Sequence, residues 1–285
     1  MNEVYEKRGY LQEEFRLFHL KDSLGSNVDF HYHEFHKLLL LHSGTGAYVA
    51  DGKRYHLQPG DMVLIGSECV HKPEFARGVE YERSIYYIDP EFIEKHDGPN
   101  CDLSGVFFST DHVFRGTPEV SHRLQRLSAE LEKEMTEKNF GYELLTKGLL
   151  LRILVEIARS RQVDSATSPQ PSAPNNRRVA QILDYIDSHI TEDLDIDSIA
   201  EAHFVSKFHM MRSFKSEVGE GMHSYINRRR LLLARELMSQ GVGVTDACFH
   251  CGFKSYSSFA RAYSRLFGCT PTGRRQAAAL EDIDE

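Results

Sequence analysis

The chain has 285 residues, of which 41% are hydrophobic and 27% are charged, and its formal net charge is -8 at pH 7. This composition is ordinary for folded globular proteins, and the length favours two domains over one. No apolar stretch approaches the roughly 18 residues of a membrane span, and the first residues lack the apolar core of an export signal. Five scattered cysteines exclude a disulfide-rich scaffold, so we expect a location in the reducing cytoplasm.

Short runs rich in Val, Ile, Leu and Tyr follow one another between residues 30 and 67. Turn residues separate these runs at Ser43-Gly44, Asp51-Gly52 and Pro59-Gly60-Asp61. Many short strands at this spacing are typical of a sandwich or a barrel. We therefore predict an α+β multidomain protein whose N-terminal domain, residues 1–162, is a β-barrel or jelly roll that ends in two helices.

A cluster of histidines opens this region, in the sequence HYHEFHK. His31 and His33 are two residues apart, so on a strand they point to the same face, and His71 follows a later strand. Three histidines can bind zinc or another transition metal. They can also hydrogen-bond a small molecule, or pack inside the barrel without any ligand.

The segments FHYHEFHKLLLLHSGTGAYVADG and YHLQPGDMVLIGSECVHKP resemble a cupin barrel, over roughly residues 28–73. The cupin metal motif has two histidines one residue apart, then a glutamate, then a distant histidine. Lys37 stands at the glutamate position, and a cation there repels a metal ion. We therefore predict a cupin-like sensor without a cofactor or bound metal. Its effector-binding residues are predicted to be His31, His33, His71, Tyr48 and Arg83.

Helical patterns replace the strand patterns further along the chain. Val120, Leu124, Leu127 and Leu131 recur at helical spacing. The next segment, YELLTKGLLLRILVEIARS, is apolar nearly all round, and such a helix needs partners on two faces. One partner is its own barrel, and the other is a second subunit. We therefore predict a homodimer that forms through the helices in 119–160.

Residues 163–177 are rich in Pro, Ser, Ala and Asn, which indicates a linker that holds neither a helix nor a strand ladder. The charge balance changes across this linker. Residues 1–165 carry 20 basic and 27 acidic residues, a net of -7, and residues 166–285 carry 14 and 15, a net of -1. Within the second part, residues 203–275 carry 12 basic and 4 acidic residues, a net of +8. A basic segment in an acidic chain indicates a face that binds a polyanion.

The C-terminal domain, residues 178–285, has only helical patterns and contains an internal repeat. Arg212 and Phe214 recur 49 residues later as Arg261 and Tyr263. Each copy is predicted to be a helix, a tight turn and a second helix with a serine N-cap and a glycine C-cap. Two helices joined in this way form a helix-turn-helix, whose second helix lies in the major groove of DNA.

The second helix of each copy is expected to bury its apolar residues and expose a basic face. Arginine makes bidentate contacts to guanine, and lysine and arginine hold phosphates. Between the copies, a helix over roughly residues 223–240, about 27 Å long, can set both second helices in successive major grooves. The predicted DNA-binding residues are Lys207, Phe208, Met211, Arg212, Lys215, Tyr256, Ser257, Arg261 and Arg265.

The segments SIAEAHFVSKFHMMRSFKSEVG, YINRRRLLLARELM and GFKSYSSFARAYSRLFGCTP resemble the DNA-binding domain of AraC-type transcriptional regulators. The resemblance covers nearly all of residues 178–272, and a cupin-like domain is the usual N-terminal partner in that family. It implies base contacts by Phe208, Met211 and Arg212 in the first copy and by Tyr256, Ser257 and Arg261 in the second.

These features predict a sequence-specific transcriptional regulator that responds to a small-molecule effector and is not an enzyme. Its expected partners are double-stranded DNA, the effector, a second copy of the chain and, for an activator, RNA polymerase. The alternative is a metal-dependent cupin enzyme with a nucleic-acid-binding tail. A bound iron or manganese ion would support that alternative, and Lys37 counts against it.

Overall fold

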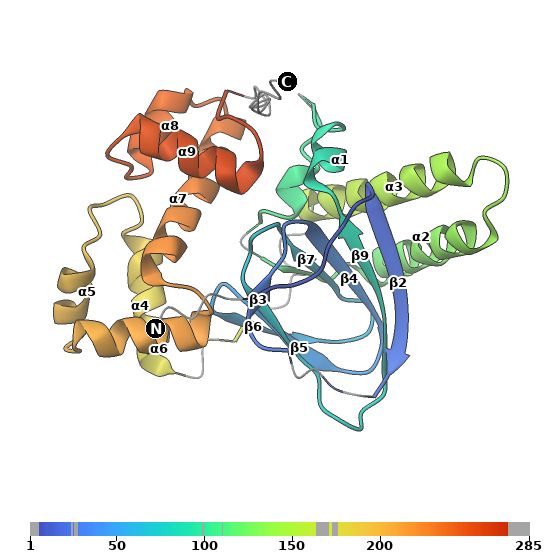
Figure 1. The fold of residues 1–285 in the computed structure, drawn as a ribbon, viewed down its shortest axis with the longest axis horizontal. Coiled ribbons are helices and arrows are strands. Elements are labelled where there is room, and N and C mark those ends of the chain that lie inside the picture. Colours follow the sequence, from blue (N-terminus) through green and yellow to red (C-terminus); the bar gives the residue numbers. More distant parts are fainter. Residues whose placement is uncertain are drawn as a thin grey trace, which may run out of the picture. The chain divides into compact units, whose positions relative to one another are not determined.

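The computed structural model describes residues 6–23, 25, 28–98, 100–109, 111–163, 171–172 and 176–272. The chain folds into two compact units, Met1–Ala173 and Pro174–Glu285. The first unit is built mainly of strands and the second is helical (Figure 1). Among the described residues, no helix has the length and apolar character that crossing a bilayer requires.

Two sheets form the N-terminal unit, and all their strand pairs are antiparallel except β1–β3. The first sheet has the order β1 (Glu6–Lys7), β3 (His31–Tyr32), β8 (His71–Glu74), β5 (Gly46–Ala50) and β6 (Lys53–Leu57). The second sheet has the order β10 (Val113–Phe114), β7 (Met62–Ile65), β4 (His36–Ser43), β9 (Tyr81–Ile88) and β2 (Phe15–Asp22).

Strand β4 shows why this unit has two apolar layers. Leu39 and Leu41 point between the sheets, where they pack with Tyr48 and Tyr55 of the first sheet. The alternate β4 leucines instead belong to a second core on the outer face of the second sheet. Side chains alternate between the two faces of a strand, so a run of four leucines marks a strand that is buried on both faces.

Two helices cover the outer face of the second sheet, α2 (Pro118–Glu137) and α3 (Tyr142–Val163) (Figure 1). A short helix, α1 (Pro90–Glu94), and one 3-10 turn, η1 (Ser104–Val106), precede them. The side chain of Thr117 caps α2 by accepting a hydrogen bond from the backbone of Val120. This is the predicted barrel followed by two helices.

Helix ends flank the predicted linker: α3 ends at Val163, and the first helix of the second unit begins at Arg177. Ser172 forms an isolated β-bridge with Arg54 of β6, which is a single residue pair and not a strand ladder. The bridge has two backbone hydrogen bonds, Ser172 N to Arg54 O at 2.8 Å and Arg54 N to Ser172 O at 3.3 Å. Strand β6 is the edge of its sheet and therefore offers backbone groups for pairing.

The helical unit contains α4 (Arg177–Ser188), α5 (Ile196–Ala202), α6 (Lys207–Val218), α7 (Met222–Ser239), α8 (Val244–His250) and α9 (Tyr256–Phe267). The pairs α5–α6 and α8–α9 are the two predicted helix-turn-helix copies, and α7 runs between them (Figure 1). Gly219 and Gly268 end α6 and α9 in the left-handed conformation, with φ of 92° and 71°. Ser255 caps α9 through its side chain, whereas Ser206 lies at the N-cap of α6 without a side-chain hydrogen bond.

Candidate DNA-binding and effector-binding sites

Helix α6 exposes the face that the sequence predicts. Its apolar residues Met210, Phe214 and Val218 are buried in the core of the helical unit. Phe208 is 83% exposed and Arg212 is also exposed. The other predicted residues of this face are partly exposed, namely Lys207, Met211 and Lys215.

Helix α9 repeats this arrangement. Phe259, Tyr263 and Phe267 are buried, with Phe259 and Tyr263 in ring contact at 5.5 Å between centroids. The Nε atom of Arg261 donates to Ser257 O at 3.3 Å, so the guanidinium lies along its own helix instead of in the core. The predicted residues of this face are all exposed: Tyr256, Ser257, Arg261 and Arg265.

Three consecutive arginines join α7 to the end of α6 and to the region of α4. Arg228 pairs with Glu220, and Arg229 Nε lies 3.0 Å from Asp187 Oδ1. Arg230 donates to two backbone oxygens after α4, at 2.9 and 2.6 Å. The sequence alone leaves phosphate contacts open for this run, but these side chains already have partners within their own unit. They hold α7 in place, and α7 in turn contacts both α6 and α9.

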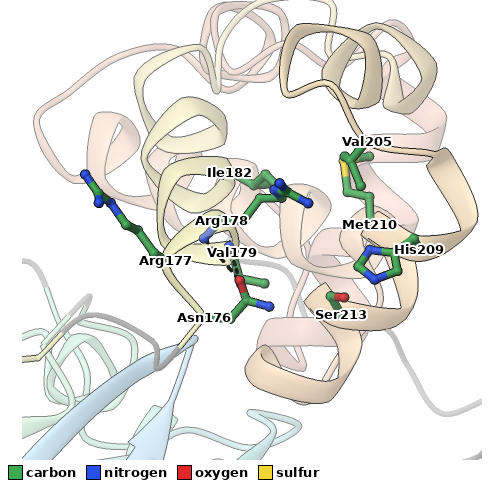
Figure 2. Close-up of a pocket in the computed structure, with 9 residues that line it drawn as sticks. All are labelled: Asn176, Arg177, Arg178, Val179, Ile182, Val205, His209, Met210 and Ser213. Atoms are coloured by element: carbon green, nitrogen blue, oxygen red, sulfur yellow. Dashed lines mark hydrogen bonds between the residues drawn. The ribbon is translucent and has the colours of Figure 1, made fainter.

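A cavity of about 240 Å³ lies between α4 and α6 (Figure 2). The side chain of Asn176 caps α4 here, accepting from the backbone N–H of Arg178 and Val179. Arg178 at the start of α4 adds positive charge to the cavity, whereas the side chain of Arg177 points away from the other lining residues (Figure 2). The sequence contains no signal for this cavity. Its lining residues are Asn176, Arg177, Arg178, Val179, Ile182, Val205, His209, Met210 and Ser213.

The N-terminal barrel brings the three predicted histidines together. One ring nitrogen from each of His31, His33 and His71 lies within 4.8 Å of those of the other two, and all three side chains are buried. The ring centroids of His31 and His71 are 4.3 Å apart. This confirms the expectation from spacing that His31 and His33 share one face.

Backbone carbonyls fix the orientation of these rings. Nδ1 of His31 is 2.8 Å from the oxygen of Asp29, and Nδ1 of His71 is 2.9 Å from that of Cys69. Nδ1 of His33 bonds to the oxygen of Arg8. A carbonyl only accepts hydrogen bonds, so each Nδ1 carries the proton and each Nε2 keeps a lone pair.

Burial keeps two of these rings neutral. The pKa of His33 falls to about 3 because burial and the charge of Lys37 disfavour the imidazolium. The pKa of His71 falls well below its usual value for the same two reasons. Among the described residues, Nε2 of His33 and Nε2 of His71 have no hydrogen-bond partner.

Tyr48 and Arg83, the other predicted effector residues, differ in their surroundings. Tyr48 is fully buried, and its ring stacks on His71 at 5.6 Å between centroids. Its hydroxyl has no hydrogen-bond partner among the described residues. Arg83 Nη1 lies 3.0 Å from Asp22 Oδ2 and its guanidinium lies over the ring of Tyr81, so Asp22 balances the charge. Among the described residues, this Nη1 atom nevertheless makes no hydrogen bond.

Lys37 is a member of this group that sequence reasoning considered only as an obstacle to metal. It lies two residues before Leu39 on β4, so its side chain points between the sheets, where its Nζ is 5.7 Å from the ring centroid of Tyr48. Burial, together with the charge of Arg83, lowers its pKa to about 8. Among the described residues, no carboxylate pairs with it.

The histidines offer a metal ion three lone pairs, but the charges around them oppose one. The positive charge of Lys37 disfavours added positive charge at both His33 and His71, and a bound cation would feel the same repulsion. No glutamate occupies the position that a cupin metal site uses. This group of side chains therefore does not suit a resident divalent cation.

A second buried cluster, which the sequence does not signal, contains Asp51, Cys69 and His112. Nε2 of His112 lies 2.9 Å from Asp51 Oδ2, and Cys69 Sγ lies 3.7 Å from Asp51 Oδ1. The cluster joins the turn between β5 and β6 to the segments after β7 and before β10. Its hydrogen bonds connect these segments inside the barrel.

Comparison with known proteins matches the two units to two family models. The model of an AraC-like ligand binding domain covers residues 19–154, and that of a helix-turn-helix domain covers residues 199–277. The HTH-type transcriptional activator RhaS of Escherichia coli O157:H7 is 25% identical over 252 residues, which are 86% of this chain and 87% of the relative. The Citrobacter koseri protein of the same name is 26% identical over 251 residues, again 86% of this chain and 87% of the relative.

Similar solved structures include ToxT from Vibrio cholerae, with a TM-score of 0.37, 13% identity and coverage of 91% of this chain and 97% of the other. Another is the DNA-binding domain of AdpA in complex with a target DNA, with a TM-score of 0.32 and 23% identity. That match covers 33% of this chain and 86% of the other. The two family models, in the order sensor then helix-turn-helix, and the full-length curated relatives agree: the chain belongs to the AraC-type transcriptional regulators.

Proposed function

We propose that this regulator binds DNA through α6 and α9 and that a small molecule bound inside the N-terminal barrel controls this binding. The observation that carries the proposal is the pair of exposed basic faces on one helical unit. Arg212 and Arg261 occupy equivalent positions in the two copies, and both are exposed on helices whose opposite face is buried. A duplicated basic face of this kind fits two successive contacts with one DNA duplex.

The exposed residues divide by chemistry into base-contacting and phosphate-contacting groups. Arg212 and Arg261 are suited to guanine, whose two acceptors match a guanidinium. Lys207, Lys215 and Arg265 are suited to phosphates, because a single cation positions the protein without reading sequence. The positive charge of the cavity at α4 is suited to a further phosphate. Phe208, Met211, Tyr256 and Ser257 complete the proposed DNA-contacting set.

Homodimerisation through α2 and α3 is supported by the exposed apolar residues around the start of α3. Phe140 is fully exposed, Leu144 is 77% exposed and Leu145 is 51% exposed. These side chains lie away from the barrel core, so a second copy can cover them. Two copies would place four recognition helices on one operator.

The proposed mechanism is a shift between arrangements of sensor and DNA-binding units. The effector has to bind one arrangement better than the other, and this preference sets the upper limit of the change in DNA affinity. The curated relatives are named activators, which supports activation and contact with RNA polymerase. The names of these relatives also support a regulator over an enzyme. A regulator that binds DNA works in the cytoplasm.

Selection of bound fragments from genomic DNA, with purified full-length protein at two salt concentrations, tests this function. We expect one recurrent sequence with two blocks about one helical turn apart, and an affinity that falls steeply as salt rises. Arg77→Ala should bind DNA like the wild type, because this exposed arginine lies in the barrel unit and not on α6 or α9. Recovery of random fragments, or no binding at low salt, would contradict the proposal.

A further inference from the structure

The buried polar groups inside the barrel require two kinds of partner, which are hydrogen-bond donors and a negative charge. Nε2 of His33 and Nε2 of His71 are buried acceptors without a donor among the described residues. Lys37, in the same interior, is a buried cation for which no described carboxylate forms an ion pair. A ligand that satisfies both must supply hydrogen-bond donors and a negative charge in one molecule.

The histidines specify the donors. Both Nδ1 atoms are engaged by backbone carbonyls, so only the Nε2 lone pairs remain for a ligand. Burial and the neighbouring ammonium of Lys37 lower the pKa of both rings, so these atoms stay acceptors at neutral pH. Hydroxyl groups are the complementary donors, and two of them are needed.

Lys37 specifies the charge. Arg83 is the other cation that acts on it, and Asp22 already compensates Arg83. The buried hydroxyl of Tyr48 also lacks a partner among the described residues. Burial raises the pKa of Tyr48 above its usual value, so the phenol keeps its proton and can donate it. An ammonium and a phenol together suit a carboxylate.

Three other ligand classes satisfy only part of this set. A divalent metal would use the lone pairs but would add charge beside Lys37. A plain aliphatic acid would pair with Lys37 but would leave both imidazoles without donors. A neutral sugar would serve the imidazoles but would leave the buried ammonium without a counter-charge.

We propose that the effector is a hydroxylated organic acid whose carboxylate pairs with Lys37 and Tyr48 and whose hydroxyl groups donate to His33 and His71. Sugar acids and related polyhydroxy acids belong to this class. The inference rests on the proposed function, because it assigns the chemistry of the same effector site.

Matched probes test this chemistry on the full-length protein by calorimetry and thermal shift. The probe acids are D-galacturonate, D-glucuronate and D-gluconate, each compared with its neutral parent sugar and with hexanoate. We expect at least one of the acids to bind about tenfold or more tightly than both comparison compounds. Equal binding of acid and neutral sugar, tighter binding of hexanoate, or binding of none of the three acids would overturn the proposal.

The variant Lys37→Met separates a ligand role from a structural one. Without ligand, we expect it to melt at a higher temperature than the wild type, because it removes a buried charge that has no counter-charge. With ligand, we expect it to lose the preference for the acid. A variant that melts lower, or that keeps the preference, would contradict the assignment of Lys37.

Two measurements on the same protein keep this inference separate from the proposed function. Selection of genomic DNA reports the regulator function without any effector, so DNA binding combined with indifference to the acids would refute the inference alone. Metal analysis of protein purified without chelator or affinity tag shows whether the histidines bind a metal ion instead. One bound transition-metal ion per chain, lost in His33→Gln, would also overturn the proposal.

Discussion

Arg228 and Glu220 form an ion pair in which the two side chains are only 10% and 8% exposed. The pair joins α7 to the end of the first helix-turn-helix, directly after the glycine that ends α6. Removing one member leaves the other charge buried without a partner, which costs about 3–5 kcal/mol in comparable cases. The structure therefore assigns to Arg228 a role in holding the helical unit together.

We predict that Glu220→Gln lowers the free energy of unfolding of the helical unit by about 3 kcal/mol. Chemical denaturation followed by circular dichroism measures the change. Lys254→Ala is the matched control, because the pair of Lys254 with Asp193 is about three-quarters exposed on both sides and such pairs contribute about 1 kcal/mol or less. Equal effects of the two substitutions would show that burial does not set the strength of the Arg228 pair.

Arg261→Ala is predicted to weaken specific DNA binding by about 1–3 kcal/mol and to relax the preference at one base pair. The exposed guanidinium beside Ser257 lies on the outward face of α9 and contributes nothing to the core, so folding should be unaffected. Lys215→Ala should instead weaken binding to all sequences alike and reduce the salt dependence. Quantitative footprinting on selected sites measures both, and identical footprints for Arg261→Ala and wild type would remove α9 from the recognition model.

Leu144→Lys is predicted to raise the dissociation constant of the homodimer about tenfold or more. The side chain is 77% exposed in the single chain, so the substitution costs little in the monomer but places a charge in the proposed interface. Light scattering during size-exclusion chromatography, over a range of concentrations, measures the change. Arg77→Ala is the control, because it alters an exposed residue outside α2 and α3. A dimer unaffected by Leu144→Lys would place the interface elsewhere.

The sequence predicts those parts of the fold that depend on local patterns. The run Leu38–Leu41, the glycine ends of α6 and α9 and their buried aromatic residues all follow from periodicity and capping. Strands β2 and β9 do not follow from such patterns, although they pair over eight residues. β2 is a largely exposed edge strand and lacks a clean alternation of apolar residues, and its partner lies far away in the chain.

Only part of the candidate effector site follows from the sequence. Spacing correctly groups His31 with His33, and the cupin resemblance adds His71, but the direction of each lone pair depends on backbone carbonyls that no motif signals. Lys37 illustrates a second limit, because its burial without a carboxylate depends on strands that are distant in sequence. The sites that sequence reasoning missed are therefore those defined by tertiary hydrogen bonds.

His33 is predicted to make the barrel less stable in acid. Its folded-state pKa of about 3 lies below the ordinary value of 6.5, so the unfolded chain binds the proton first as pH falls. Stability is therefore complete above pH 6.5 and falls by about 1 kcal/mol per pH unit towards pH 3. We expect His33→Gln to have a shallower dependence in urea denaturation between about pH 7.5 and pH 5. Parallel curves for variant and wild type would show that His33 takes up a proton without unfolding.

The bridge between Ser172 and Arg54 is predicted to fasten the linker to the edge of the barrel. Ser172→Pro removes the N–H that donates to Arg54 O at 2.8 Å, whereas Ser172→Ala keeps both backbone bonds and loses only the hydroxyl contact at 3.2 Å. We expect limited proteolysis to cut the linker several-fold faster in Ser172→Pro and at the wild-type rate in Ser172→Ala. Because β6 also lines the barrel interior through Tyr55 and Leu57, we predict that the bridge couples the packing inside the barrel to the linker. Loss of the effector response in Ser172→Pro, with effector affinity unchanged, would establish this route from sensor to DNA, and a full response would exclude it.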